Sequence, residues 1–99
     1  MADLSAPRPK TVKRLFALSR NTCAFPSCRT RLVDEVGSVV GEICHIRAQS
    51  VGGPRYDPSQ SNEQRHAFEN LILMCGSHHK RVDENELEYT VARLEEIKR

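Results

Sequence analysis

Two pairs of metal-binding side chains, far apart in this 99-residue sequence, limit the possible folds more than any other feature. Cys23 and Cys28 enclose a short segment that contains Pro26, and Cys75 is followed three positions later by His78. Four such ligands, brought together as two close pairs, form the closed tetrahedral sites in which proteins hold structural zinc. We therefore predict a structural zinc ion at Cys23, Cys28, Cys75 and His78. In the alternative interpretation, Cys75 is a buried free thiol and His78 lies on the surface.

The size and composition of the chain favour such an ion. A chain of 99 residues forms one small domain, and small domains bury only a modest share of their surface. Hydrophobic residues make up 38% of the sequence, which indicates a thin core. The sequence has no apolar run of the ~18 residues that a membrane span needs, and no apolar segment of a secretory signal at its start. We expect a cytoplasmic protein without a membrane partner, whose thiols stay reduced, with a disulfide between Cys23 and Cys28 as the less favoured alternative.

The pattern of apolar and capping residues predicts an α+β domain over residues 10–99, preceded by a flexible arm at residues 1–9. Helices are expected at both ends of the domain. The amphipathic pattern of residues 10–20 predicts the first helix, with Thr11 as its start. The second helix is capped by Thr90 and continues to the last residue. Between them we expect a hairpin of residues 31–33 and 39–46, a polar loop over 47–64, an apolar run at 71–74 and a helix at 77–82.

A second group of ligands remains once the zinc site is assigned. His79 is adjacent to His78, and adjacent residues of a helix point about 100° apart, so the two histidines are expected to serve different sites. Asp83 follows His79 by one helical turn, where an imidazole and a carboxylate can bind one ion together. We predict that His79 and Asp83 hold a divalent ion; the alternative for Asp83 is an ordinary solvent-facing carboxylate. His45 lies near the end of an expected strand, where a base can face the same ion.

These residues resemble the signature of the HNH endonucleases of the ββα-metal type. The first histidine of the signature matches His45 in Glu42-Ile43-Cys44-His45-Ile46, its asparagine matches Asn70 in Glu69-Asn70-Leu71, and its last histidine matches His79 in Cys75-Gly76-Ser77-His78-His79. More narrowly, the chain is similar to HNH domains attached to SAVED sensors in bacterial CBASS anti-phage systems, through Gly41-Glu42, His45-Ile46, Gly53-Pro54-Arg55, Asn70-Leu71-Ile72-Leu73 and His78-His79. The resemblance implies a small ββα-metal HNH nuclease domain with a zinc knuckle and flanking N- and C-terminal helices.

The resemblance further implies hydrolysis of DNA phosphodiester bonds. The residues form no obvious base-reading pattern, so we expect little sequence specificity. Magnesium or manganese suits the open site, with nickel or zinc as further ions because histidine prefers softer metals. His45 is then the general base, Asn70 holds the loop that keeps His45 in register, and His79 with Asp83 binds the catalytic ion. A sensor is expected beyond Arg99 or on another chain of a bacterial sensor-effector system, with copies of the chain associating on activation. The cations beside the signature are expected to contact phosphate, with plain surface charge as the alternative for each: Arg47, Arg55, Lys80 and Arg81.

Cys44 departs from the pattern of the family, and His66 has no place in it. Cys44 stands where many members of the family have a metal-binding aspartate, so other groups are expected to hold the ion, with Asp83 a better candidate than Glu42. His66 lies in a polar stretch and is expected to be exposed and without a role. The alternative function is a zinc-stabilised module that binds nucleic acid or protein without catalysis, and that does not depend on the catalytic histidines. A thiol redox role for Cys44 is disfavoured because the sequence has no C-x-x-C pair.

Overall fold

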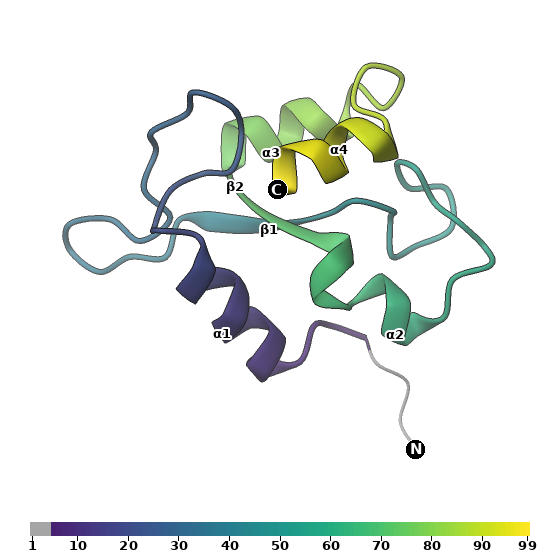
Figure 1. Cartoon of the computed structure of the whole chain (residues 1–99), viewed down its shortest axis with the longest axis horizontal. Helices are drawn as coiled ribbons and strands as arrows, with labels where there is room; N and C mark the ends of the chain where they lie inside the picture. The colour runs from purple at the N-terminus through teal and green to yellow at the C-terminus, as the bar shows by residue number, and fades with distance from the viewer. Residues whose placement is uncertain (1–4) are drawn as a thin grey trace.

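The computed structural model of the chain describes residues 5–99, so residues 1–4 of the predicted N-terminal arm lie outside the described residues. Helices and two short strands alternate along the chain (Figure 1), which confirms the predicted α+β class. The elements are α1 (Pro9–Leu18), β1 (Gly41–His45), α2 (Asn62–Arg65), the 3-10 turn η1 (Phe68–Asn70), β2 (Leu71–Cys75), α3 (Gly76–Asp83) and α4 (Val91–Lys98). Within the described residues, no helix combines the length and the apolar character that a bilayer crossing requires.

The two strands form an antiparallel sheet at the centre of the fold. Every residue of β2 is buried, which explains its continuous apolar sequence. Helix α1 packs on β2 and η1, while α3 packs on both strands, so that helices cover the two faces of the sheet (Figure 1). The register pairs His45, the last residue of β1, with Leu71, the first residue of β2. As a result, His45 lies beside η1 and its terminal residue Asn70.

The first helix differs from its prediction at both ends. It begins at Pro9 and not at Thr11, because proline has a backbone angle suited to the first helical position and has no N–H to leave unpaired. It ends at Leu18, since Arg20 and Asn21 adopt positive φ values of 56° and 55°, which a helix cannot continue through. This turn directs the chain toward the first cysteine pair.

The predicted hairpin is present only as a short turn. Asp34 caps it by accepting hydrogen bonds from the backbone N–H groups of Val36 and Ser38, and an isolated bridge joins Val33 to Val39. Beyond the bridge the backbone N–H groups of Val40 and Gly41 still donate to the carbonyl of Leu32, and from Gly41 the second arm pairs, as β1, with β2. The apolar alternation predicted extended structure correctly but could not identify the partner strand, because pairing partners are set by long-range packing.

The last helix begins as predicted, after Thr90, and ends at Lys98, one residue before the predicted end. The Thr90 side chain accepts a hydrogen bond from the backbone N–H of Arg93, which satisfies one of the free donors at the helix start. Leu94 then points inward and is fully buried, next to the fully buried Tyr89 that precedes the cap. Helix α4 therefore covers one side of the core.

Candidate metal centres

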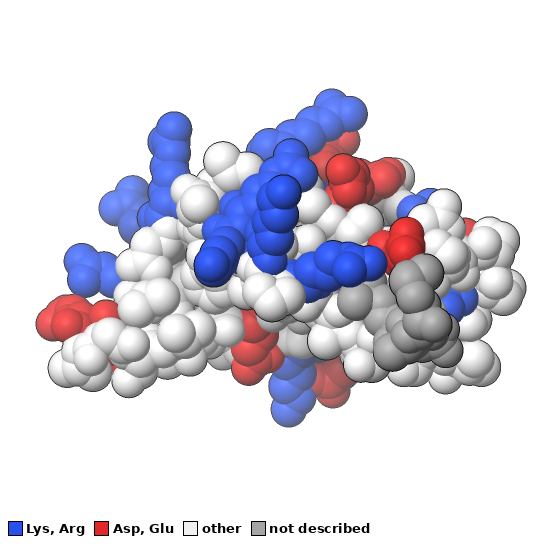
Figure 2. Space-filling view, turned by 90° about the horizontal axis from the view of Figure 1, so that it is seen from below, with Lys and Arg blue, Asp and Glu red and all other residues white. Residues whose placement is uncertain are grey.

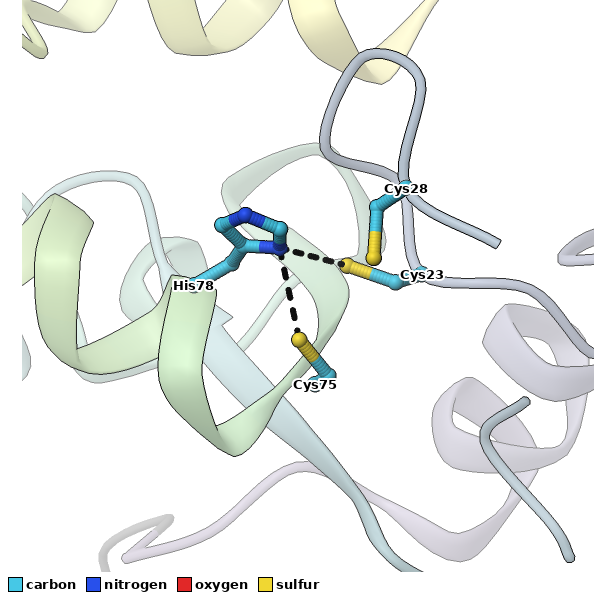
Figure 3. A group of neighbouring side chains, drawn as sticks. All are labelled: Cys23, Cys28, Cys75 and His78. Atoms are coloured by element: carbon cyan, nitrogen blue, oxygen red, sulfur yellow. Dashed lines mark hydrogen bonds between the residues drawn. The ribbon is translucent and has the colours of Figure 1, made fainter. Parts of the chain in front are cut away.

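The first cluster contains the four predicted zinc ligands. Cys23 and Cys28 come from the loop after α1, Cys75 ends β2, and His78 lies in the first turn of α3 (Figure 3). Their candidate ligand atoms all lie within 4.8 Å of one another. Nδ1 of His78 is 3.3 Å from Sγ of Cys75 and 3.8 Å from Sγ of Cys23. The fold therefore brings together two ligand pairs that are far apart in the sequence.

These distances fit a tetrahedral ion. With zinc bonds of about 2.3 Å to sulfur and about 2.0 Å to nitrogen, a tetrahedron separates sulfur from nitrogen by about 3.5 Å. The two sulfur-to-nitrogen distances, 3.3 and 3.8 Å, lie on either side of that value. The four cysteines of the chain are all free thiols, so Cys23 and Cys28 form no disulfide. The cluster can hold a metal such as zinc.

Backbone contacts place the first cysteine pair against the sheet. The N–H of Cys23 donates to the carbonyl of Thr30, and the N–H of Ala24 donates to the carbonyl of Leu73 in β2. The ring of Phe25 stacks on the imidazole of His78, with centroids 4.0 Å apart and planes 3° from parallel. The residues between the two cysteines thus orient the histidine ligand as well as the thiols.

The two thiols of this pair differ in acidity. Burial raises the pKa of Cys23 to about 11. The hydroxyl of Thr30, 3.4 Å from Sγ of Cys28, stabilises the thiolate and lowers the pKa of Cys28 to about 6. At neutral pH without metal, Cys28 is therefore ionised whereas Cys23 carries a proton.

Zinc affinity is expected to rise with pH. Below a pKa of about 11 the thiol of Cys23 must lose a proton to bind metal, whereas Cys28 is already ionised above about pH 6. Cys23 alone then contributes a tenfold gain in affinity per pH unit, or about a hundredfold between roughly pH 6.5 and 8.5. Competition with a chromophoric chelator across this range measures the gain. An affinity independent of pH would contradict the assignment of Cys23 as a ligand.

A second group of candidate ligands consists of Cys44, His79 and Asp83, whose ligand atoms also lie within 4.8 Å of one another. Nε2 of His79 is 3.1 Å from Oδ2 of Asp83, across one turn of α3. Sγ of Cys44, from the facing strand β1, is 3.8 Å from Oδ1 of the same carboxylate. The i, i+4 pair predicted from the sequence is thus in place. The third member is Cys44, the residue that the sequence had led us to leave out of the ligand set.

Neighbouring charged groups orient this second group. Oε1 of Glu42 is 2.8 Å from Nδ1 of His79, and a hydrogen bond there leaves Nε2 directed at Asp83. A histidine that donates one nitrogen to a carboxylate and offers the other to a metal is a common arrangement in metal sites. Gly76 leaves room for the Glu42 carboxylate, because a Cβ at position 76 would lie 3.1 Å from Oε2 of Glu42. Glu42 therefore supports the ligand His79 and is not a member of the group itself.

The pKa values of the two α3 residues move in opposite directions. The hydrogen bond with Asp83 raises the pKa of His79, and Glu42 adds to the effect. Burial opposes ionisation of Asp83, but hydrogen bonds from His79 and Arg55 outweigh it and lower the pKa of that carboxyl. Without a metal the pair therefore favours imidazolium and carboxylate. A bound cation would take the place of the proton between them.

Arg55 was predicted to contact phosphate, but its side chain lies in the interior of the protein. It is only 5% exposed, and its Nη2 donates to Oδ1 of Asp83 at 2.8 Å. The same guanidinium also donates to the backbone carbonyls of His45, Ile46, Val82 and Tyr89. It therefore ties the loop after β1 to α3 and to the segment before α4, and its charge is already paired.

His66 was predicted to be exposed and without a role, and this prediction is wrong. Its side chain is buried, with 4% of the residue exposed, and its Nδ1 is 3.2 Å from Nε2 of His45. The two rings meet edge to face, with centroids 5.2 Å apart. Burial lowers the pKa of His45 to about 4, and the charge on His66 that protonation would create adds to the effect. His45 is therefore a neutral imidazole at pH 7.

Asn70 forms the contacts with the loop that the sequence predicted. Its Oδ1 accepts from the N–H of Arg47 at 2.9 Å, and its Nδ2 donates to the carbonyl of the same residue at 2.9 Å. Nδ2 also donates to the carbonyl of Arg65 at 2.8 Å. One buried amide thus fixes the chain two residues after His45 and one residue before His66.

A cavity of about 340 Å³ connects these groups. His45 from β1 and His79 with Asp83 from α3 line it, and the loop after β1 closes it, through residues that include Gln49, Gly53 and Pro54. Two of the three candidate ligands and the neutral histidine therefore border the same space. A substrate in this cavity could contact the neutral histidine and an ion held by the candidate ligands.

The remaining predicted phosphate contacts are accessible to different degrees. Lys80 and Arg81 are exposed on α3, next to His79. Arg47 is half-buried and lies 3.9 Å from Asp57. Many further lysines and arginines gather on the face seen from below in Figure 2. Exposed cations of α1 lie on that side of the sheet, whereas α3 lies on the other (Figure 1).

Comparison with known proteins adds no family to this description. Neither a protein-family model nor a curated protein matches the chain. The chemistry of the cavity therefore has to be inferred from the residues that border it.

Proposed function

We propose that the chain is a metal-dependent endonuclease of the HNH type, which hydrolyses phosphodiester bonds of DNA with little sequence specificity. The observation that carries the proposal is the cavity at which the neutral imidazole of His45 meets His79 and Asp83. Hydrolysis of a phosphodiester needs a base for the attacking water and a cation for the charge that builds on phosphate. A zinc-stabilised binding module needs neither group.

Each residue of the cavity has a defined task in this proposal. His45 is unprotonated at pH 7 and accepts a proton from the attacking water. Asn70 holds the loop that positions His45. Cys44, His79 and Asp83 bind a divalent ion, which supplies positive charge to the phosphate and to the leaving oxygen when it is bound.

Cys44 affects the choice of ion. Burial raises the pKa of its thiol to about 12, with the negative charge of Asp83 as the second cause, so a bound metal must displace the thiol proton. Thiolate and imidazole ligands favour softer ions, whereas magnesium prefers oxygen. We therefore propose that manganese, cobalt or zinc serves the site better than magnesium does.

The variant Cys44→Asp tests the choice of ion. Replacing sulfur with oxygen is expected to raise the rate with magnesium relative to the rate with manganese by about tenfold, because magnesium prefers oxygen ligands. Initial rates of plasmid nicking in each ion give the ratio. Cys44→Ser, which removes the thiol without adding a carboxylate, is the matched control. An unchanged ratio in Cys44→Asp would place Cys44 outside the metal site.

The substrate surface is proposed next to the cavity. Lys80 is exposed on the helix that carries His79 and Asp83, so a phosphate backbone that enters the cavity would lie within its reach. Contacts of this kind position a nucleic acid but do not read its sequence. Arg81 is exposed on the same helix, but its guanidinium lies 5.6 Å from the centre of the Phe25 ring, on the side of the Cys/His cluster. A sensor partner, activation through association of copies and a role in anti-phage defence remain predictions that follow from the sequence resemblance.

Metal add-back separates a nuclease from a binding module. Zinc-loaded protein is passed through a desalting column and incubated with supercoiled plasmid, with and without manganese, cobalt or magnesium. The wild type is expected to nick the plasmid only when a second ion is added. His79→Ala is expected to keep one zinc per chain, measured by elemental analysis, and to lose nicking. Equal nicking by both proteins, or none in any ion, would favour the non-catalytic module.

A further inference from the structure

His66 is a buried polar side chain that the proposed mechanism does not use. It follows the short helix α2, whose start is held by reciprocal hydrogen bonds between Ser61 and Gln64. The backbone N–H of His66 donates to the carbonyl of Asn62. Its imidazole thus extends from a well-ordered turn to the ring of His45, far away in sequence.

We propose that His66 is a positioning residue that selects the tautomer of His45, a role that rests on the proposed nuclease function. Nδ1 of His66 accepts a hydrogen bond from Nε2–H of His45, across 3.2 Å. The proton of His45 then resides on Nε2, and the lone pair resides on Nδ1. Among residues 5–99, Nδ1 of His45 has no hydrogen-bond partner, so this nitrogen remains available to a water molecule.

The direction of this hydrogen bond decides whether His45 can act as a base. Between two neutral imidazoles one nitrogen must donate and the other must accept. If Nδ1–H of His66 donated, Nε2 of His45 would accept with its lone pair, and the proton of His45 would reside on its Nδ1. The imidazole would then have no free lone pair for the attacking water. Only the arrangement in which His66 accepts leaves a base in the cavity.

The surroundings keep the two rings at this separation. Asn70 binds the carbonyl of Arg65 and both backbone groups of Arg47, so the segments that carry the two histidines are fixed to one side chain. The guanidinium of Arg65 is turned to other acceptors, namely the hydroxyl of Tyr56 and Oδ1 of Asn62. Among residues 5–99, the ring of His66 meets the ring of His45 both edge to face and through the 3.2 Å nitrogen-to-nitrogen contact.

Nitrogen-15 NMR of the histidine side chains tests the proposal without relying on activity. Long-range nitrogen-to-proton correlations at neutral pH show which ring nitrogen of His45 carries the proton. The wild type is expected to show the Nε2–H tautomer. His66→Asn places an amide oxygen near the position of Nδ1 and is expected to preserve it. His66→Leu removes the acceptor and is expected to shift His45 to a mixture of both tautomers.

Kinetics give the second readout. His66→Leu is expected to lower kcat for plasmid nicking by about tenfold, as the loss of a group that orients a functional histidine does elsewhere, with KM within about twofold. His66→Asn is expected to restore most of the rate. A wild-type His45 protonated on Nδ1, or a tautomer unchanged in His66→Leu, would overturn the proposal. A wild-type His45 protonated on Nδ1 overturns the proposal even if a variant does not fold, and the shift of tautomer in His66→Leu is the result that assigns the selection to His66, whether or not the protein cleaves DNA.

Discussion

Replacing Cys23 and Cys75 with serine in one protein is expected to abolish the folded state. The two residues come from the loop after α1 and from the end of β2, so an ion bound by both would join the loop to the sheet. Structural zinc supplies roughly 10–16 kcal/mol in small zinc-binding peptides. The net stability of a domain is only about 5–15 kcal/mol. Losing two of four ligands therefore removes more free energy than the fold is expected to hold in reserve.

Two measurements check this expectation. Elemental analysis should find one zinc per chain in the wild type and none in the double variant. Thermal unfolding followed by circular dichroism should show a cooperative transition only in the wild type. Cys44→Ser is the matched control, since it makes the same substitution at the cysteine outside the cluster and is expected to keep the zinc. Retained zinc with an unchanged Tm in the double variant would contradict a structural role for the site.

Replacing His45 with alanine is expected to lower the rate of DNA nicking by about 10²- to 10⁴-fold, the usual contribution of a general base. The protein should still fold and keep its zinc, because His45 belongs to neither pair of zinc ligands. Initial rates on supercoiled plasmid measure the loss. Leu87→Ala, at a side chain that is 94% exposed, is a control for purification and handling. A rate within a few-fold of the wild type would remove His45 from the mechanism.

The pH dependence of nicking should distinguish the two histidines of the cavity. A pKa of about 4 keeps His45 unprotonated, and therefore basic, until the pH falls through that value. His79 has a raised pKa and must lose its proton to bind an ion, so activity should already decline at the higher pH at which His79 is protonated. Raising the ion concentration is expected to move this decline to lower pH. A decline independent of the ion concentration would show that metal binding at His79 does not cause it.

The cluster of Cys23, Cys28, Cys75 and His78 could be predicted from the sequence because each of its two pairs is local. Each pair of ligands lies within a few residues, and thiol and imidazole groups at these spacings have few other uses. The same applies to Thr90, whose side chain caps a helix through a contact with Arg93, three residues away. Features of this kind depend on neighbours along the chain, and they agree with the structure.

The features that sequence reasoning missed depend on packing between distant segments. His66 is buried because the chain around α2 folds back on the end of β1, and Arg55 is buried because its guanidinium binds carbonyls from three separate parts of the chain. Residues of these types are usually exposed, so composition predicted the wrong environment. Cys44 was left out of the ligand set because the family pattern has aspartate there. The spatial arrangement places its thiol with His79 and Asp83, at the position where the pattern has a metal-binding aspartate.

The adjacent histidines of α3 have a consequence for a cell that makes this protein. His78 belongs to the cluster that can hold zinc and His79 to the cavity, so the first turn of one helix carries a candidate ligand of each site. A newly synthesised chain that has not yet acquired zinc would lack the fixed helix that presents His79. Under the proposed function, zinc supply would thus control when nicking can begin, and a chain made during zinc starvation would be harmless to the DNA of its own cell.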